Sequence, residues 1–293
     1  MESITVLRGK RILLGVTGSI AGYKSIDLAS KLTQGGAEVD VIMTESATRF
    51  VTPLAFRSVT GRSVYTDMWE LDDHVRHVGL GESADLMLIA PATANTIARL
   101  AHGMADNLLS VTALAARCPL IVAPAMDGGM WSHPATQANV TILRERGVAI
   151  VGPAEGRMAS GLTGLGRMVE PQDLLGEIRL RLGANGSLAG RRVIVSTGPT
   201  REAVDPVRFI SNRSSGKQGI AVAQAGLDAG AQVILVAGPT CEEPPYGSQV
   251  IDVQTTQEMG DAILSAIDGA DILMMVAAVA DFRPNAVADR KIK

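Results

Sequence analysis

Short apolar runs alternate with longer amphipathic segments along the first part of the chain. The apolar runs, which have the length of buried strands, cover residues 11–16, 38–43, 86–90, 119–123 and 148–152. Between them lie segments with helical spacing of apolar residues, such as TGSIAGYKSIDLASKL and HPATQANVTILRERG. Strands that alternate with helices predict parallel βαβ units, so we expect a doubly wound α/β sheet.

The same alternation begins again near residue 191. RRVIVS reads as a strand, KQGIAVAQAGLDAG as a helix, QVILVAG as a strand, 256–267 as a helix and DILMMVAA as a strand. The stretch before this second series, GANGSLAG, is rich in small residues and has no periodicity, which is typical of a linker. We therefore predict a first domain over 1–182, a linker over 183–190 and a second, Rossmann-like domain over 191–293.

The composition supports this α/β fold and excludes several classes of partner. The chain is 46% hydrophobic but only 3% aromatic, as expected for helices packed closely on parallel strands. Its net charge of −3 gives no broad attraction to nucleic acid or to acidic membranes. Cys118 and Cys241 are too few for a disulfide framework or a cysteine-based metal site. We expect a cytoplasmic protein, because no signal peptide and no 18-residue apolar run is present.

The loop TGSIAGYK follows a predicted strand and opens a predicted helix. Gly18 permits a tight turn and Ser19 can donate its hydroxyl hydrogen to an anion. The N–H groups of Ile20 and Ala21 would point at a phosphate placed over the helix N-terminus. Small residues also occur here simply to allow close packing, so both interpretations stay open. The loop lacks the GxGxxG spacing, which makes a dinucleotide the weaker choice of ligand.

Polar residues follow the predicted strands at 86–90 and 119–123, at the edge where open α/β sheets bind ligands. Thr93, Asn95 and Thr96 follow the strand at 86–90, and they can equally form a helix-capping turn. PAMDGGMW, residues 124–131, repeats the arrangement after the following strand. Its apolar side chains, considered alone, are more typical of packing than of cofactor contacts.

The four histidines do not indicate a metal site. They are His74, His77, His102 and His133, and only the first two show H-x-x-H spacing. No downstream cysteine completes a ligand set, so we predict no protein-bound metal. His77 precedes a glycine-rich turn and could act as a general base, although a lone loop histidine is often only a surface residue.

Residues 151–171, VGPAEGRMASGLTGLGRMVEP, contain five glycines and no hydrophobic periodicity. From composition alone they could form a linker or a lid over a site. The four earlier stretches TGSIAGYK, PATANTIARL, GMADNLL and PAMDGGMW, in this order, resemble the FMN-binding cysteine decarboxylases.

The second half of the chain extends this resemblance. TGPTREAVDPVRFISNRSSGKQG (197–219), AAVADFRP (277–284) and the terminal KIK closely resemble phosphopantothenate–cysteine ligase. Without the resemblance, SNRSSGK would read as a polar loop that caps a helix. Both halves together resemble the bacterial bifunctional phosphopantothenoylcysteine decarboxylase/phosphopantothenate–cysteine ligases of coenzyme A synthesis, over almost the whole chain.

For the first half, the resemblance implies a flavodoxin-like unit that assembles as a homotrimer or dodecamer, with FMN bound near a subunit interface. His77 would reach the substrate across that interface as a catalytic base. Residues 151–171 would form the clamp over the substrate, which makes them a lid whose glycines serve as hinges. The expected FMN contacts are Gly18, Ser19, Ile20, Thr44, Thr93, Ala94, Asn95 and Met126.

For the second half, the resemblance implies that CTP activates 4'-phosphopantothenate as an acyl-cytidylate and that the amine of cysteine displaces CMP. Asn212 would handle the acyl intermediate, with Arg208 on the same loop. Mg²⁺ is expected with the triphosphate. Members of the family continue beyond KIK, so we expect the ligase part to be incomplete here. The expected nucleotide contacts are Met275, Val276, Ala277, Asp281 and Lys291.

The decarboxylase of this family then acts on phosphopantothenoylcysteine. Flavin oxidises the cysteinyl thiol to a thioaldehyde, CO₂ leaves, and the resulting enethiol is protonated and reduced to 4'-phosphopantetheine. In the familiar pattern a clamp cysteine donates the proton, and an asparagine in a PxMN loop binds the substrate carboxylate.

Two residues of this chain depart from that pattern. Ser160 stands at the cysteine position, and an alcohol is a far weaker acid than a thiol with its pKa near 8.5. Asp127 stands at the asparagine position. Two carboxylates about 4 Å apart would repel each other by about 4 kcal/mol at an effective dielectric constant near 20. Asp127 must therefore be protonated, point elsewhere or hold a different group.

Three functional interpretations follow. We favour full decarboxylation with another proton donor, such as water, Arg157 or Arg167, because the ligase motifs supply the substrate. The site could instead release the enethiol, or the protein could be a catalytically weak FMN-binding interaction protein. A flavin-dependent prenyltransferase of the same superfamily is disfavoured by the ligase motifs.

Overall fold

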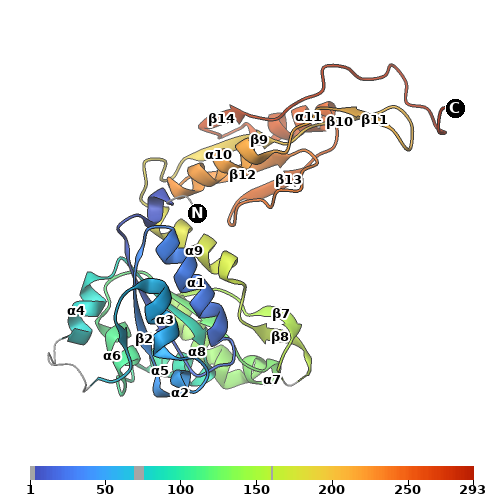
Figure 1. The fold of residues 1–293 in the computed structure, drawn as a ribbon. Coiled ribbons are helices and arrows are strands. Elements are labelled where there is room, and N and C mark those ends of the chain that lie inside the picture. Colours follow the sequence, from blue (N-terminus) through green and yellow to red (C-terminus); the bar gives the residue numbers. More distant parts are fainter. Residues whose placement is uncertain (1–3, 69–75, 160) are drawn as a thin grey trace. The chain divides into compact units, whose positions relative to one another are not determined.

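The computed structural model describes residues 4–68, 76–159 and 161–293 (Figure 1). The chain forms two compact units, Met1–Ile178 and Arg179–Lys293. The division falls within a helix, α9 (Pro171–Gly183), and so lies earlier than the predicted linker at 183–190. The segment 183–190 packs within the second unit. Cβ atoms at Gly183 and Gly186 would each overlap a carbonyl oxygen, that of Asp228 and that of Ala229, and Leu188 packs against the core of that unit.

The first unit is built on a six-stranded parallel sheet with the order β3-β2-β1-β4-β5-β6. This order confirms the predicted doubly wound sheet. Strands β1 to β3 are added toward one edge of the sheet and β4 to β6 toward the other, so the strand order reverses between β1 and β4. Ligands of such folds bind at this point, beyond the carboxyl ends of the strands. The strands are β1 (Arg11–Val16), β2 (Glu38–Met43), β3 (Val64–Tyr65), β4 (Leu86–Ala92), β5 (Leu120–Pro124) and β6 (Ala149–Ile150).

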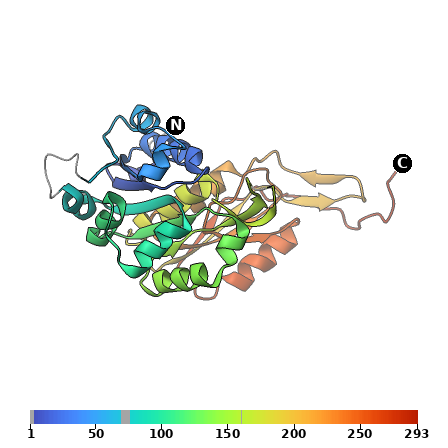
Figure 2. The same ribbon diagram turned by 90° about the horizontal axis from the view of Figure 1, so that it is seen from below.

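Helices cover both faces of this sheet (Figures 1 and 2). On one face, Leu13, Met87 and Ile89 of the strands pack with Leu109 and Val140 of the covering helices, and all five side chains are buried. The helices before α9 are α1 (Gly22–Gln34), α2 (Glu45–Thr48), α3 (Pro53–Thr60), α4 (Arg76–Ser83), α5 (Ala94–His102), α6 (Leu108–Ala115), α7 (Gly128–Ser132) and α8 (Pro134–Glu145). A short 3-10 helix, η1 (Thr5–Leu7), precedes β1.

The glycine-rich stretch at 151–171 contains an antiparallel hairpin of β7 (Ala154–Arg157) and β8 (Thr163–Arg167). Two of its glycines allow close contacts that a side chain would block. A Cβ atom at Gly156 would lie 2.7 Å from Cδ of Arg167, and one at Gly166 would overlap the carbonyl oxygen of Met126. The stretch is therefore a packed element of the first unit.

The second unit is a smaller α/β layer whose parallel sheet has the order β13-β12-β9-β14. α10 (Lys217–Asp228) packs on one face of the sheet and α11 (Thr256–Ala266) on the other, as the periodicity predicted. The hairpin of β10 (Arg201–Ala203) and β11 (Phe209–Ser211) projects from the sheet in both views (Figures 1 and 2). The sheet strands are β9 (Arg192–Thr197), β12 (Gln232–Ala237), β13 (Gln249–Asp252) and β14 (Ile272–Met275).

None of the helices in the described part of the chain is both long and apolar enough to span a bilayer.

Candidate functional site

A cavity of about 700 Å³ opens at the carboxyl edge of the first sheet. This volume lies within the range of about 300–1,000 Å³ that small ligands and cofactors occupy. Its walls come from the loops after β1, β4 and β5 and from the β7–β8 hairpin. The lining residues include Gly18, Ser19, Ile20, Tyr23, Lys24, Phe50, Thr93, Met126, Asp127, Met130, Arg157, Met158, Gly166, Arg167 and Met168.

The loop after β1 is fixed to the loop after β4 through a buried threonine. Thr17 donates its hydroxyl hydrogen to the carbonyl of Pro91 at 2.6 Å and accepts the Thr93 N–H at 3.1 Å. Gly18 is required, because a Cβ atom there would lie 2.5 Å from Cβ of Ser46. The Ala21 N–H, predicted to face a phosphate, donates locally to Oγ of Ser19 at 3.3 Å.

Two of the predicted FMN contacts, Thr93 and Thr44, are N-caps of helices, and a capping role is one of the two alternatives that the sequence left open for the turn at Thr93. Thr93 caps α5 by accepting the Thr96 N–H at 3.3 Å, and it lines the cavity as well. Thr44 caps α2 and lines a neighbouring cavity of about 500 Å³. Ala94 and Asn95 form the first turn of α5, where Asn95 is exposed.

The residues of the larger cavity fit a group such as FMN. Ile20, Phe50 and Met130 are large apolar side chains more than half exposed, and they supply walls for a flat ring system. The hydroxyl of Ser19 and the start of α1 supply donors and a favourable dipole for a phosphate.

The hairpin is attached to the floor of the cavity at two places. The Met126 N–H donates to the carbonyl of Gly166 at 3.0 Å, and the Gly128 N–H donates to Sδ of Met158 at 3.1 Å. Both contacts join the hairpin to the loop that carries Asp127. The hairpin and the Asp127 loop therefore form one continuous wall.

The same hairpin is tied to α1 by a buried lysine. Nζ of Lys24 donates to the carbonyl of Met168 at 2.9 Å and to the carboxylate of Glu170 at 2.7 Å. The Lys24 side chain is only 6% exposed, whereas Glu170 is 59% exposed. Lys24 therefore joins the helix that follows the Gly18 loop to the chain that leaves the hairpin.

Asp127 is the N-cap of α7, and its Oδ1 accepts the Gly129 N–H at 3.0 Å. Of the three options that the sequence left for Asp127, this contact matches the third, a carboxylate that holds a different group. Arg157 and Arg167 line the same cavity and bring positive charge to it. The cavity lining therefore carries two guanidinium groups as well as the Asp127 carboxylate.

Two predicted catalytic residues fall outside what the structure describes. Ser160 lies outside the described residues. His77 belongs to α4, but its side chain is likewise outside the description.

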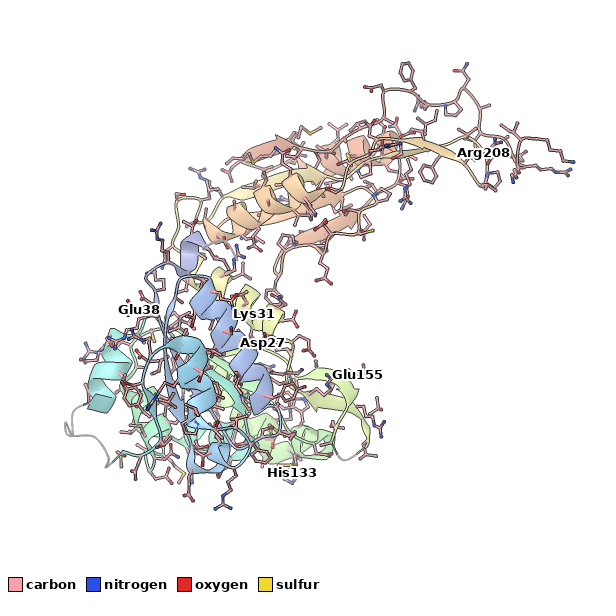
Figure 3. The ribbon with its side chains drawn as sticks, viewed as in Figure 1. Asp27, Lys31, Glu38, His133, Glu155 and Arg208 are labelled. Atoms are coloured by element: carbon pink, nitrogen blue, oxygen red, sulfur yellow. The ribbon has the colours of Figure 1, made fainter. Side chains whose placement is uncertain are left out.

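In the second unit, the predicted ligase residues lie in two groups. Nδ2 of Asn212 donates to the carbonyls of Val279 at 2.8 Å and Ala278 at 3.2 Å. Arg208, labelled near the end of the β10–β11 hairpin in Figure 3, donates to the carbonyl of Ile292 at 2.9 Å. Arg208 therefore contacts Ile292, the residue that follows Lys291.

Part of the backbone at 275–277, which the resemblance predicts to line a base pocket, already forms hydrogen bonds within the protein. The N–H groups of Val276 and Ala277 donate to Oγ of the buried Ser196 at 3.0 and 3.2 Å. Both N–H groups are therefore hydrogen-bonded within the protein. Met275, in β14, is 62% exposed, and Asp281 is exposed. Among the described residues, no cluster of three or more His, Cys, Asp or Glu side chains could hold a metal ion.

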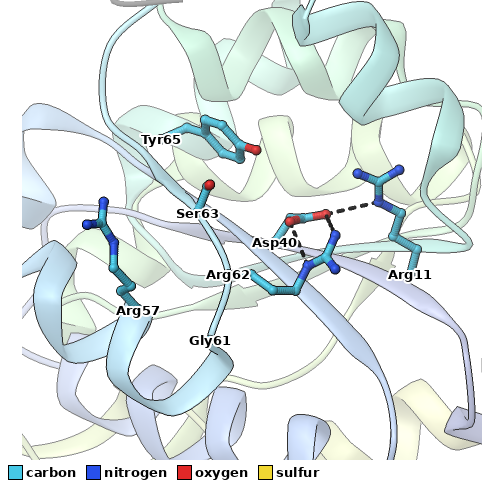
Figure 4. Close-up of a pocket in the computed structure, with 7 residues that line it drawn as sticks. All are labelled: Arg11, Asp40, Arg57, Gly61, Arg62, Ser63 and Tyr65. Atoms are coloured by element: carbon cyan, nitrogen blue, oxygen red, sulfur yellow. Dashed lines mark hydrogen bonds and ion pairs between the residues drawn. The ribbon is translucent and has the colours of Figure 1, made fainter.

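Another cavity, of about 410 Å³, lies beside the first residues of β1 and β2 (Figure 4). Its centre is the buried carboxylate of Asp40, which accepts hydrogen bonds from Arg11 at 2.9 Å and from Arg62 at 2.9 and 3.0 Å. The hydrogen bond to Asp40 raises the pKa of the Arg62 guanidinium. Arg62 also pairs with Glu38 at 3.1 Å. Arg11 and Arg62 thus pair with carboxylates of the protein itself.

Comparison with known proteins identifies the family of the chain. Residues 2–183 match the Flavoprotein family, and residues 188–293 match the family described as DNA/pantothenate metabolism flavoprotein C-terminal domain. The coenzyme A biosynthesis bifunctional protein CoaBC of Bacillus subtilis is 45% identical over 293 residues, covering 98% of this chain and 72% of that protein. The chain belongs to the CoaBC family. CoaBC of Mycobacterium tuberculosis H37Rv is 47% identical over 289 residues, covering 97% and 69% of the two chains.

Solved structures resemble the decarboxylase part of this CoaBC family member. A PPC decarboxylase mutant complexed with pantothenoylaminoethenethiol matches with a TM-score of 0.55 and 36% identity, covering 59% of this chain and 98% of that one. The FMN-binding protein AtHal3 matches with a TM-score of 0.54 and 36% identity, covering 59% and 96%. These likenesses agree with the flavodoxin-like first unit.

Sequence reasoning missed two residues that build the site, Lys24 and Met158. Lys24 is marked only as a charged residue on the face of a helix that otherwise carries buried apolar and small residues. Nothing in the local sequence marks Met158, because its contact depends on where the hairpin lies. Gly166 was expected to be a hinge glycine, and its close contact with Met126 was not foreseen.

Proposed function

We propose that the chain carries out two steps of coenzyme A biosynthesis. Its second unit ligates 4'-phosphopantothenate with cysteine at the expense of CTP, and its first unit decarboxylates phosphopantothenoylcysteine to 4'-phosphopantetheine with FMN. The single observation that carries the decarboxylase assignment is the one cavity walled by the Gly18–Ser19 loop, the Asp127 loop and the β7–β8 hairpin. The curated relatives, named as bifunctional CoaBC proteins, support the pairing of the two activities.

In the first unit, Ser19, Ile20 and Thr93 would hold FMN, with Met126 and Met130 against its ring. When bound, FMN supplies the two-electron oxidation of the cysteinyl thiol that makes loss of CO₂ possible. His77 would take a proton from the substrate, in keeping with its position in the family pattern.

The hairpin contributes charge and shelter to the same reaction. Arg157 and Arg167 would pair with the carboxylate or the phosphate of the substrate, which offsets the repulsion from Asp127. The hairpin would also exclude water from the reacting thiol, which strengthens these charge interactions.

In the second unit, Asn212 would bind the acyl intermediate, and Arg208 and Lys291 would face the phosphates of CTP. Met275, Val276, Ala277 and Asp281 would surround the nucleotide. Mg²⁺ would arrive with the triphosphate, whose oxygens are its preferred ligands. We further expect a cytoplasmic enzyme whose first unit assembles as a homotrimer or dodecamer.

A second candidate function is favoured by one residue, Ser160. A site without a clamp thiol would stop at the enethiol for want of a proton donor. In support, a cysteine-to-serine mutant of PPC decarboxylase has been solved with pantothenoylaminoethenethiol bound.

One anaerobic incubation separates these functions. The FMN-loaded protein is mixed with phosphopantothenoylcysteine, flavin absorbance is followed, and the product is identified by mass. Phosphopantetheine with reoxidised flavin establishes full decarboxylation, whereas an enethiol with reduced flavin establishes the second candidate. No turnover by the flavin-loaded protein would overturn both and favour an FMN-binding interaction protein.

A further inference from the structure

Asp205 lies in the connection between β10 and β11 and accepts an unusual number of hydrogen bonds. Its Oδ1 accepts the N–H groups of Val207 at 2.9 Å and Arg208 at 2.8 Å. Its Oδ2 accepts Nε of Arg208 at 2.9 Å, a second guanidinium hydrogen from Nη2 of Arg208, and the N–H of Ile292 at 3.0 Å. The Asp205 side chain is buried beneath these partners.

These contacts join two parts of the second unit that are far apart in sequence. Arg208 also donates from Nη2 to the carbonyl of Ile292 at 2.9 Å, so both backbone groups of Ile292 are held. The Ala288 N–H donates to the carbonyl of Val204 at 3.1 Å, which fixes the same segment four residues earlier. The segment 288–292 therefore lies beside the connection between β10 and β11.

The consequence concerns two basic side chains. Arg208 is oriented directly by Asp205, and its guanidinium plane is set by the two bonds that this carboxylate accepts. Lys291 immediately precedes Ile292, whose N–H and carbonyl are both engaged, so the Lys291 backbone is placed beside Arg208. The Asp205 carboxylate accepts hydrogen bonds from the Arg208 side chain and from the Ile292 N–H. It can therefore hold Arg208 and the neighbouring Lys291 close enough to bind one anionic ligand.

We infer that Asp205 is a positioning residue for the ligase reaction. It brings Arg208 and the Lys291 segment together so that both can meet the phosphates of a nucleoside triphosphate. This inference rests on the proposed ligase function. Asp205 itself would not touch the substrate, because its oxygens are occupied by protein donors.

The test uses the full chain with Asp205→Asn, and with Asp205→Glu as the conservative variant. Native trypsin digestion, followed by intact mass, reports how fast the chain is cut after Arg290 and Lys291. We expect Asp205→Asn to be cut at least about tenfold faster than the unaltered chain, since an amide replaces two charge-assisted bonds. Asp289→Asn is the matched control in the same segment, and we expect it to be cut at the unaltered rate.

Ile292→Pro serves as a second variant that leaves Asp205 intact. It removes the one backbone N–H that Asp205 accepts from the segment, so we expect faster cleavage after Arg290 here too. Equal cleavage of Asp205→Asn, Ile292→Pro and the unaltered chain would overturn the inference.

Ligase kinetics supply the functional readout. We expect Asp205→Asn to raise the KM for CTP by at least about tenfold while decarboxylation of added phosphopantothenoylcysteine is unchanged, and Asp205→Glu to recover part of the loss. A fall in kcat alone, with KM unchanged, would show a merely structural residue and overturn the inference. A chain that never ligates but shows the expected cleavage pattern would refute the ligase function and retain Asp205 as the group that holds the segment.

Discussion

Asp85 and Asp271 occupy the same place in the two units of the chain. Asp85 precedes β4 and accepts the N–H of Arg11, the first residue of β1, at 2.8 Å. Asp271 precedes β14 and accepts the N–H of Arg192, the first residue of β9, also at 2.8 Å. In each unit one aspartate carboxylate thus fixes the register between two paired strands, β1 and β4 in the first unit and β9 and β14 in the second.

The Asp85 contact predicts a dependence of stability on pH. Burial alone would raise the pKa of Asp85, but hydrogen bonds from Lys10 and the Arg11 N–H outweigh it and hold the pKa below its ordinary value. A depressed native pKa means that the stabilisation is fully present above the unfolded pKa, about 3.9, and is lost as pH falls through the native pKa. We expect Asp85→Asn to be less stable than the unaltered chain at pH 7, and we expect the difference to shrink as the pH falls below about 4.

Urea unfolding followed by tryptophan fluorescence measures this effect, because Trp131 lies in α7 of the first unit. Asp27→Asn is the control, since Asp27 forms an exposed ion pair with Lys31, and its loss should cost less than about 1 kcal/mol. A constant difference between Asp85→Asn and the unaltered chain at every pH would refute the prediction.

The order of strands and helices was predictable because the buried strands of a parallel sheet appear in the sequence as continuous apolar runs. β4 is buried along its whole length, and the sequence shows it as a continuous apolar run. The two antiparallel hairpins show no such sequence pattern. β7 and β8 carry glycines and half-exposed residues, so neither alternation nor a continuous apolar run marks them.

The candidate site was predictable only where it follows strand ends. The loops at Gly18, Thr93 and Asp127 come directly after β1, β4 and β5, and parallel strands bring these ends to one edge. The contact between Lys24 and Glu170 joins residues 146 positions apart. No local pattern encodes such a pair, because it depends on the path of the hairpin across the sheet.

Lys24→Met is expected to loosen the hairpin. Methionine fills the space of the lysine stem but leaves the carbonyl of Met168 without its donor, which costs about 1–3 kcal/mol. The lost ion pair adds little, because Glu170 is 59% exposed and its charge is screened. Urea unfolding gives the loss, and hydrogen exchange over residues 154–168 shows where it acts. Lys31→Met, on the same helix, is the control, and an equal loss in both variants would contradict the prediction.

Gly166→Ala should separate the hairpin from the Asp127 loop. Its Cβ atom would overlap the carbonyl oxygen of Met126 and lie 2.8 Å from Sδ of Met158. Overpacking of this kind costs about 1–3 kcal/mol. We expect lower stability and less FMN retained on gel filtration. Gly260→Ala, where a Cβ atom meets nothing within 4 Å in α11, should be neutral or slightly stabilising, and full FMN retention by Gly166→Ala would disprove the contact's role.

Asp127→Asn tests the charge in the cavity without disturbing the helix cap. Asparagine caps a helix as well as aspartate, so we expect stability within about 0.5 kcal/mol of the unaltered chain. Removal of the negative charge should lower the KM for phosphopantothenoylcysteine roughly tenfold, a change of about 1.4 kcal/mol. Asp127→Ala removes the same charge and also the cap, which costs about 1 kcal/mol. An unchanged KM in both variants would mean that Asp127 does not face the substrate carboxylate.

Ser160→Cys supplies the thiol that this chain lacks at the expected donor position. A thiol with its pKa near 8.5 can protonate the enethiol intermediate, whereas an alcohol is a poor acid at neutral pH. If the unaltered protein stops at the enethiol, Ser160→Cys should raise the yield of phosphopantetheine at least about tenfold and return the flavin to its oxidised form. Ser160→Ala separates the remaining cases under the same anaerobic conditions. Unchanged phosphopantetheine formation by Ser160→Ala would assign the proton to water or to an arginine of the hairpin, whereas its loss would make the Ser160 hydroxyl the donor despite its weak acidity.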